Sequence, residues 1–264
     1  MTIQDLCNGF VTVKTIRSVV YREGLSMRLF VACLATCFIA LPAMAQNTSG
    51  VSGAKVSASD KGLEFRAAFV PGEDGAPDRT AFRFHYQKGL ADNLRLRIIA
   101  SGSNRGNGAD YDALKAEIVW QMTPDAYEAW ASALRFEATL RDGDRPEQLG
   151  VNWINEFPFE RGWVARTNLI VARDVGDFAM DGVLLQTRAS LGKSFGDGYS
   201  LSGLLFSNYG SSERLGRFDT QNHQLGPVLS GKTDAGWTWS VGSMFGLSEA
   251  AADTDLRFWI GRNF

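Results

Sequence analysis

The sequence predicts an all-β fold, a transmembrane antiparallel up-and-down β-barrel of about 12 strands. Three observations predict it. Apolar and polar residues alternate along segments that are mostly nine to twelve residues long, which is the length of a tilted strand crossing a bilayer. The connections between these segments are alternately long and short. Aromatic residues gather at the ends of the segments that face the short connections.

The alternation is clearest in residues 79–87, where Phe82, Phe84 and Tyr86 are separated by the polar residues Arg83 and His85. Successive side chains of a strand point to opposite faces, so this pattern gives one apolar face and one polar face. Twelve segments show it: 62–70, 79–87, 93–101, 111–122, 127–141, 148–157, 163–173, 182–193, 199–209, 221–231, 236–246 and 255–264.

A water-soluble β-sandwich also alternates, and the connections distinguish the two folds. A membrane barrel has short periplasmic turns at one end and longer loops at the other, whereas a sandwich has no such requirement. The connections after odd-numbered segments run six to eleven residues: 71–78, 102–110, 142–147, 174–181, 210–220 and 247–254. Those after even-numbered segments run four or five: 88–92, 123–126, 158–162, 194–198 and 232–235.

The aromatic residues on the apolar face predict a girdle at one membrane interface. Amphipathic rings are favoured where hydrocarbon meets water. The predicted members are Tyr86, Trp120, Trp130, Trp153, Phe157, Trp163, Tyr199, Trp237 and Trp239.

Two segments fit the pattern less well. Tyr127, Trp130 and Leu134 also have helical spacing, and a helix here would leave 11 strands, an odd number that bacterial single-chain barrels avoid. We therefore expect residues 127–141 to be a strand. Pro227 has no backbone N–H to offer, so we expect a bulge in 221–231.

The first part of the chain has the order of a secretory signal. Met27 and Arg28 precede an uncharged apolar run, 29–42, and Ala43-Met44-Ala45 supplies small residues for cleavage after Ala45. We expect 27–45 to be a signal peptide and 1–26 to be a miscalled start or a non-structural extension. Residues 46–61, rich in Ser, Gly and Ala, are expected to be a flexible lead-in to the barrel, 62–264.

The composition excludes several classes of function. The chain has 27 Lys and Arg against 29 Asp and Glu, which argues against a nucleic-acid partner. Its three cysteines, Cys7, Cys33 and Cys37, all precede residue 46, and it has only two histidines. No disulfide, metal site or cofactor is therefore expected in the barrel.

The last nine residues resemble the final strand of bacterial outer-membrane proteins, which ends in an aromatic residue with apolar residues alternating behind it. Phe258, Ile260 and Phe264 fit this pattern, while Arg262 departs from it and is expected to snorkel at the interface. The resemblance implies a location among outer-membrane lipids and recognition of these residues by the outer-membrane assembly machinery. The oligomeric state is left open.

The predicted inward face is basic, and function should come from it because a fold alone assigns none. The acids of this face are Glu64, Glu117, Glu137, Glu156 and Asp255. Its bases are Arg66, Arg83, Arg95, Arg97, Lys115, Arg135, Arg141, Arg166, Arg188 and Arg257, with His85 among them.

This excess of bases favours a narrow channel or transporter for small, mainly anionic solutes and not an enzyme. In its arginine-lined lumen the chain resembles the twelve-strand porins for acidic oligosaccharides. A plugged or structural barrel is the alternative.

A second alternative is an outer-membrane lipid hydrolase. Outer-membrane phospholipases, also twelve-strand barrels, carry serine and histidine on the lipid-facing side. Ser207 and His223 have that phase, and they face each other if Tyr209 pairs with Gln221. The family's histidine is missing from its usual place before the serine, and no asparagine or acid is expected to orient His223.

Overall fold

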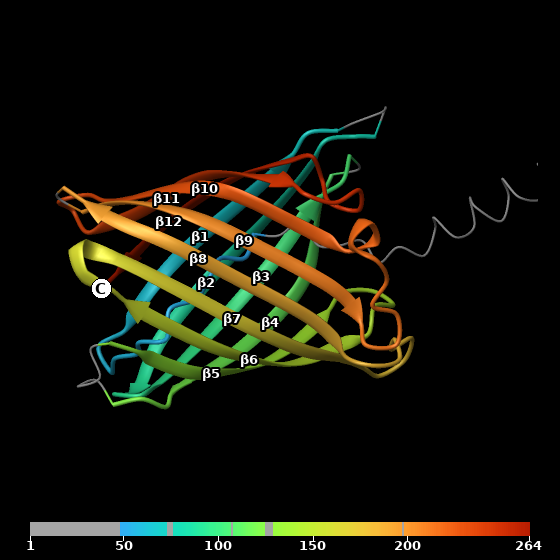
Figure 1. Cartoon of the computed structure of the whole chain (residues 1–264). Coiled ribbons are helices and arrows are strands. Elements are labelled where there is room, and N and C mark those ends of the chain that lie inside the picture. Colours follow the sequence, from blue (N-terminus) through green and yellow to red (C-terminus); the bar gives the residue numbers. More distant parts are fainter. Residues whose placement is uncertain (1–47, 73–75, 107, 125–128, 197) are drawn as a thin grey trace, which may run out of the picture. The chain divides into compact units, whose positions relative to one another are not determined.

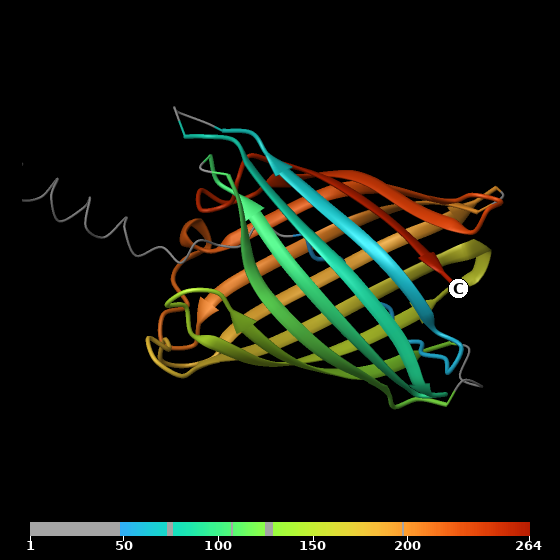
Figure 2. The same cartoon turned by 180° about the vertical axis from the view of Figure 1, so that it is seen from behind.

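The computed structural model describes residues 48–264 except 73–75, 107, 125–128 and 197. The expected leader, 1–45, and the first two residues of the strand expected at 127–141 lie outside the described residues. Twelve antiparallel strands close into one barrel in which each strand pairs with its sequence neighbours (Figures 1 and 2). The strands are β1 (Lys61–Val70), β2 (Arg79–Ala91), β3 (Leu94–Asn104), β4 (Ala109–Gln121), β5 (Ala131–Arg141), β6 (Glu147–Pro158), β7 (Trp163–Val175), β8 (Leu184–Phe195), β9 (Tyr199–Ser211), β10 (Asn222–Lys232), β11 (Trp237–Gly246) and β12 (Thr254–Asn263).

The expected fold class is confirmed, and the ring closes where the last strand meets the first. β12 pairs with β1 from Gly62 opposite Asn263 to Phe69 opposite Leu256. Phe264 continues this ladder by donating its backbone N–H to the carbonyl of Lys61 at 2.8 Å. A closed ladder leaves no open strand edge, which is the condition for a sheet surrounded by lipid. Two short 3₁₀ turns, η1 (Glu160–Gly162) and η2 (Phe218–Thr220), lie in connections, and no helix in the described part is long and apolar enough to cross a membrane.

The two faces of each strand differ as the alternation predicts. Phe84 on the outer face is 58% exposed, whereas the next residue, His85, points inward and is 5% exposed. Exposed large apolar residues recur on the outer face of most strands, including Leu63, Leu169 and Leu225. The outer wall of the barrel is therefore apolar, and the polar groups lie in the lumen.

The connections keep the predicted alternation with two exceptions. Those after β1, β5, β7, β9 and β11 run five to ten residues, while β2–β3, β6–β7, β8–β9 and β10–β11 are joined by two to four residues. The expected long connection 102–110 is only four residues, because β3 extends to Asn104 and β4 begins at Ala109. The expected turn 123–126 is longer, because β4 ends at Gln121 and β5 begins only at Ala131. The strand expected at 127–141 is confirmed for 131–141, and the barrel keeps its even strand number.

The aromatic girdle is present at the short-connection end. Trp120, Trp153, Trp163 and Trp237 lie at or near that end of their strands, each more than one third exposed. The Arg262 guanidinium lies 5.6 Å from the centre of the Trp237 ring, so the cation rests on the girdle instead of in hydrocarbon.

The bulge expected at Pro227 is absent. Pro227 lies opposite Gly203 of β9, and the pairing of β10 with both neighbours keeps one register on either side of it. The register shifts lie elsewhere, at Gly89/Ala91, Ser101/Gly102 and Leu185/Gln186. Gly226 explains why the strand accepts Pro227 without a bulge. The Gly226 backbone packs directly against that of β11, where a side chain would not fit.

Residues 48–60 differ from the expected flexible lead-in. They lie inside the barrel, with Thr48 and Ala54 completely buried and Val56 5% exposed. The segment ends at the short-connection end, where Gly89 of β2 donates its N–H to the Asp60 carbonyl and Arg95 of β3 pairs with the Asp60 carboxylate at 3.0 Å. Small side chains, which predict flexibility in water, here allow the backbone to pass close to the lumen wall.

We expect the long connections to face the cell exterior. Residues 46–264 contain no cysteine, so Arg217→Cys in the 212–221 loop and Asp234→Cys in the β10–β11 turn give single thiols at opposite ends. Only the first should react with a membrane-impermeant maleimide on intact cells, and both should react after lysis. If only Asp234→Cys were labelled on intact cells, the orientation of the barrel would be the opposite of the one expected.

We expect loss of Phe264 to impair assembly. Its ring receives the Lys61 ammonium at 4.9 Å and its N–H extends the closing ladder. Deletion of Phe264 should lower the amount of heat-modifiable barrel in outer-membrane fractions, while Phe264→Tyr, which keeps the ring, should not. Equal barrel levels in the deletion and the wild type would contradict this role.

Candidate functional site

The lumen is the candidate site, and at its centre five arginines from five strands donate to oxygen atoms of residues 48–52. The donors point inward because each occupies the inward phase of its strand. The contacts are Arg66 to the Thr48 carbonyl (3.5 Å), Arg257 to the Ser49 carbonyl (3.2 Å), Arg83 to Ser49 Oγ (2.8 Å), Arg188 to the Gly50 carbonyl (3.4 Å) and Arg135 to Ser52 Oγ (2.8 Å).

The segment also has two apolar contacts with the wall. Ala54 and Val56 join a buried cluster with Val119, Ala133 and Ile154 of β4, β5 and β6. Val51 packs against a second cluster, formed by Leu204, Phe206, Val228 and Met244 of β9, β10 and β11. Apolar residues on an otherwise polar lumen wall thus mark where the segment lies.

Two glycines let the backbone of the segment approach the wall. A β-carbon on Gly50 would lie 2.9 Å from the Trp259 ring, and one on Gly53 would lie 2.6 Å from the Glu156 carboxylate. The Asn168 side chain of β7 fixes the backbone between them, accepting from the Ser52 N–H (2.8 Å) and donating to its carbonyl (3.1 Å). The segment therefore has one defined path through the lumen.

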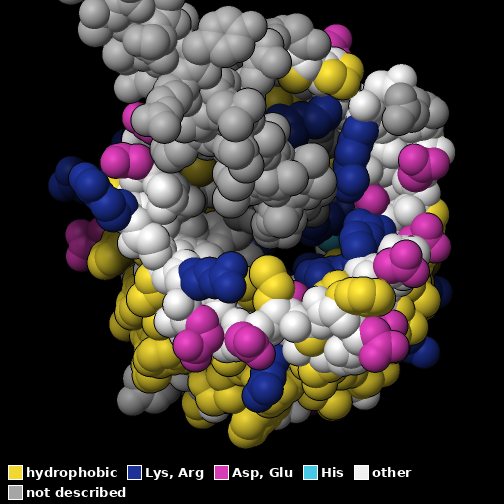
Figure 3. Space-filling view, turned by 90° about the vertical axis from the view of Figure 1, so that its right-hand side faces the viewer, with side chains coloured by type: hydrophobic (Ala, Val, Ile, Leu, Met, Phe, Trp, Pro, Cys, Tyr) yellow, Lys and Arg dark blue, Asp and Glu magenta, His cyan; other side chains and the backbone are white. Residues whose placement is uncertain are grey.

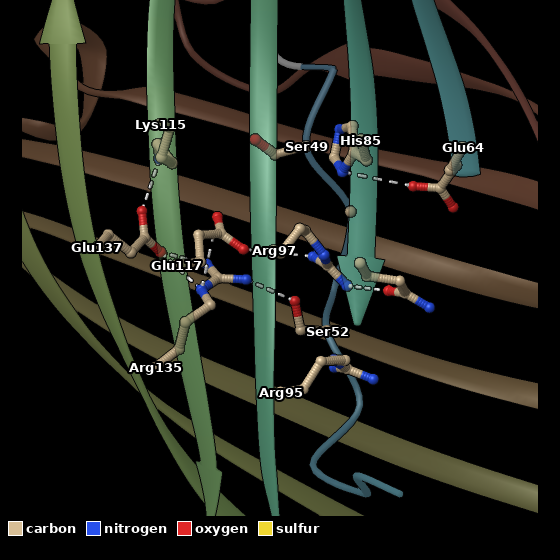
Figure 4. Close-up of polar contacts among 12 residues, drawn as sticks. Ser49, Ser52, Glu64, His85, Arg95, Arg97, Lys115, Glu117, Arg135 and Glu137 are labelled. Atoms are coloured by element: carbon tan, nitrogen blue, oxygen red, sulfur yellow. Dashed lines mark hydrogen bonds and ion pairs between the residues drawn. The ribbon is translucent and has the colours of Figure 1, made fainter. Parts of the chain in front are cut away.

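Most of the predicted lumen charges are paired. Glu117 and Glu137 form a network with three bases (Figure 4): Lys115 lies 2.6 Å from Glu137, Arg135 lies 2.6 Å from Glu137, and Arg97 lies 3.4 Å from Glu117. These side chains come from three adjacent strands, β3, β4 and β5. Ion pairs thus hold this side of the lumen together, with one base in excess of the two acids.

Further pairs neutralise other bases of the predicted set. The pairs are Arg66–Glu64 (2.6 Å), Arg95–Asp60 (3.0 Å), Arg141–Asp174 (3.3 Å), Arg166–Glu156 (2.8 Å) and Arg257–Asp255 (2.7 Å). Two of these acids, Asp60 and Asp174, were not among the predicted lumen acids. Asp174 has the inward phase of β7 and could have been found by extending that strand one residue beyond its predicted end.

Arg83 and Arg188 contact no carboxylate in the described part of the chain. Arg83 donates to Ser49, and Arg188 donates to Gly50 and to the Gln186 side chain at 3.2 Å. Their strands, β2 and β8, are six positions apart in the ring of twelve and so lie on opposite walls. Two guanidinium groups from opposite sides thus reach the same dipeptide.

Several buried side chains have polar atoms without a hydrogen-bond partner among the described residues, and two of them leave a pair of such atoms: both ring nitrogens of His85 and both amide atoms of Asn152. The single atoms are Thr48 Oγ1, Arg95 Nε, Arg97 Nε, Asp255 Oδ1 and Trp259 Nε1. Glu64 Oε1 lies 3.6 Å from His85 Nδ1, too far for a hydrogen bond. Among the predicted lumen bases of β2 and β3, Arg95 and Arg97 pair with acids, whereas Arg83 donates to Ser49 of the segment.

The end of the barrel with the long connections carries charges of both signs. Figure 3 looks onto this end and shows Lys and Arg side chains together with Asp and Glu side chains around its rim, with hydrophobic side chains on the outer wall. No group of three or more His, Cys, Asp or Glu residues in the described ranges is arranged to hold a metal ion.

A second constellation lies on the outer face near the long-connection end of β9 and β10. Ser207 lies directly opposite His223, as predicted, and Ser207 Oγ is 2.9 Å from His223 Nδ1. His223 Nε2 is 2.9 Å from Gln221 Oε1. An amide oxygen only accepts, so Nε2 carries the proton and Nδ1 accepts from the serine hydroxyl.

Gln221, which is neither an asparagine nor an acid, contacts the His223 ring and was not among the predicted residues. Residues two apart along extended chain share a face, which is the signal that could have identified it. The Phe218 ring stacks on His223 at 4.4 Å and Tyr209 meets it edge-on at 5.7 Å, so the imidazole is only 6% exposed.

Comparison with known proteins shows a shared architecture. No protein-family model and no curated protein sequence matches the chain. Among solved structures, the KdgM porin matches with a TM-score of 0.56 and 12% identity over 77% of this chain and 99% of its own. The NanC porin matches with a TM-score of 0.55 and 10% identity over 76% and 98%.

An outer-membrane channel from Pseudomonas putida F1 matches with a TM-score of 0.56 and 10% identity, over 82% of this chain and 100% of its own. At such low identity these matches bear on the fold alone. The chain has the fold of the outer-membrane porins, a closed twelve-strand antiparallel β-barrel.

Proposed function

We propose that this protein is an outer-membrane channel for small anionic solutes, exported with a signal peptide that is cleaved after Ala45. The porin-like barrel, its apolar outer wall and its aromatic girdle support the location. The charge distribution in the lumen supports the solute class. Its bases, Arg66, Arg83, His85, Arg95, Arg97, Lys115, Arg135, Arg166, Arg188 and Arg257, are proposed to line the path.

The observation that carries the proposal is the pair Arg83 and Arg188. A cation removed from bulk water is costly unless a charged partner compensates it, and most other lumen bases have a carboxylate within 4 Å. These two donate instead to neutral oxygen atoms. Their uncompensated charge, on opposite walls, raises the local concentration of anions and repels cations.

The paired bases shape the path, and their network of three bases and two acids adds one formal positive charge to it. Lys115, Arg97 and Arg135 are held by Glu117 and Glu137, so this side of the lumen offers alternating donors and acceptors. A solute with hydroxyl groups as well as a negative charge would find partners for both. The KdgM porin has been solved in complex with oligogalacturonate, which is a solute of this chemistry.

We expect the purified protein to be anion-selective. In a planar bilayer under a salt gradient, its reversal potential should lie on the anion side. The double substitution Arg83→Gln/Arg188→Gln should move it toward cations, because it removes the two uncompensated charges and leaves the ion pairs intact. Arg262→Gln, which removes a cation from the outer face at the girdle, is the matched control and should not change the selectivity.

Two results would count against the proposal. A conducting wild type without anion preference would refute the role of the arginines. Folded, heat-modifiable protein that never conducts, even after removal of residues 48–57, would refute a channel altogether.

The Ser207–His223–Gln221 arrangement favours a second candidate function, hydrolysis of a lipid acyl ester. Ser207 Oγ would attack the ester carbonyl carbon while its proton passes to His223 Nδ1. His223 would then protonate the departing alcohol oxygen, and a water molecule would hydrolyse the acyl-serine. Leu205 and Leu225, both exposed to lipid below the pair, offer a surface for the acyl chain.

We expect this candidate to be decided by a serine-directed probe. If Ser207 is a nucleophile, a fluorophosphonate should label the protein in detergent or liposomes, and the adduct should map to Ser207 by mass spectrometry. Labelling should disappear in Ser207→Ala and fall in His223→Phe, while Ser230→Ala, in the same barrel, should leave it unchanged. Absence of labelling in folded wild type would leave the pair as a hydrogen bond without catalytic use.

A further inference from the structure

We propose that residues 48–57 are an internal ligand of the lumen arginines, which closes the channel and is displaced by the anion that passes. This inference rests on the proposed channel function and adds its regulation. The segment lies where an extended solute would lie, and it uses the same donors. It therefore competes with the solute for one site.

The segment occupies hydrogen-bond donors that would otherwise bind an anion. Five arginines converge on its oxygen atoms, and these oxygens are hydroxyls and backbone carbonyls without formal charge. Residues 48–57 contain no acidic residue, and Lys55 is their one charged side chain. A guanidinium bonds a carboxylate or phosphate more strongly than a neutral carbonyl. An anionic solute that reaches Arg83 and Arg188 is thus the better ligand.

The segment is anchored at its C-terminal end, and along the rest it is held by contacts that a solute could replace. At residues 57–60 the chain turns, with Asp60 N–H donating to the Ser57 carbonyl at 3.0 Å. The Asp60 carboxylate pairs with Arg95, and Lys61 begins β1. Residues 48–56 are held instead by hydrogen bonds to their uncharged oxygen atoms and by the small apolar contacts of Val51, Ala54 and Val56. This division allows 48–56 to leave the wall while the barrel stays intact.

The fit of the lumen wall argues that the segment occupies a specific site. Asn168 binds both backbone groups of Ser52, and Gln121 Oε1 accepts from the Val56 N–H at 2.7 Å. Both are buried polar side chains on the lumen wall. Such groups are costly to bury unless they are satisfied, and the segment satisfies them.

The first experiment removes the internal ligand. Deletion of residues 48–57 retains Asp60 and all twelve strands, and its folding is checked by heat modifiability. In a planar bilayer its single-channel conductance should be several-fold that of the wild type, and its anion preference should persist. Ser59→Ala, at the exposed turn outside the deleted residues, is the control and should conduct like the wild type.

The second experiment fixes the segment in place. Ser52→Cys/Asn168→Cys puts two thiols at positions whose native groups are hydrogen-bonded, in a barrel that otherwise has no cysteine. Oxidation should form a cross-link, visible as a mobility shift, and should abolish solute-dependent opening, which reduction should restore. The two single-cysteine variants should not respond to oxidation.

The outcomes separate this inference from the function on which it rests. If wild type and deletion variant conduct equally, or if the cross-linked protein conducts like the reduced one, residues 48–57 do not close the channel. The channel itself would still stand in both cases. If the folded deletion variant does not conduct, the channel function fails.

Discussion

Closure of the ring by β12 on β1 is the constraint on which the rest of the structure depends. A strand surrounded by hydrocarbon has no water to bond its backbone, so every strand needs a partner on both sides. Once the register from Gly62–Asn263 to Phe69–Leu256 is set, alternate residues are committed to lipid or to lumen. A shift of one residue would exchange Phe258 with Arg257 and place a guanidinium in the bilayer.

This commitment concentrates charge in a small enclosed volume, and the interior is organised around compensating it. Glu117 and Glu137 pair with three bases from neighbouring strands and leave one positive charge in excess, and Asp60 and Asp174 pair with one base each. Arg83 and Arg188 donate only to neutral oxygen atoms among the described residues, those of Ser49, Gly50 and Gln186. The polar groups of the N-terminal segment thus supply hydrogen-bond acceptors to the lumen arginines that have no carboxylate partner.

The strands and their facing could be predicted because the period of two is a local property. Phe84 and His85 differ in exposure as their positions in the pattern require, and Ser207 meets His223 at the predicted register. The path of residues 48–60 could not be predicted, since Ser, Gly and Ala carry no periodic signal. Its apolar contacts on the wall, such as Val119 and Ile154, occupy positions that the alternation assigns to polar residues. The β4–β5 connection was misjudged because Trp130 fits a strand end and a loop equally well.

The location of residues 48–60 has a consequence for the order of biogenesis. The segment continues directly into β1, which is one side of the closing seam. A completed cylinder would have to admit this segment through an end, against arginines that already line its interior. Before β1 and β12 pair, the growing sheet is open along its whole length. The segment can then bind to β5, β7 and β8 before the barrel closes. The last strands would then fold around the N-terminal segment. Its removal would lower the rate of membrane insertion even where the free energy of unfolding of the finished barrel is unchanged.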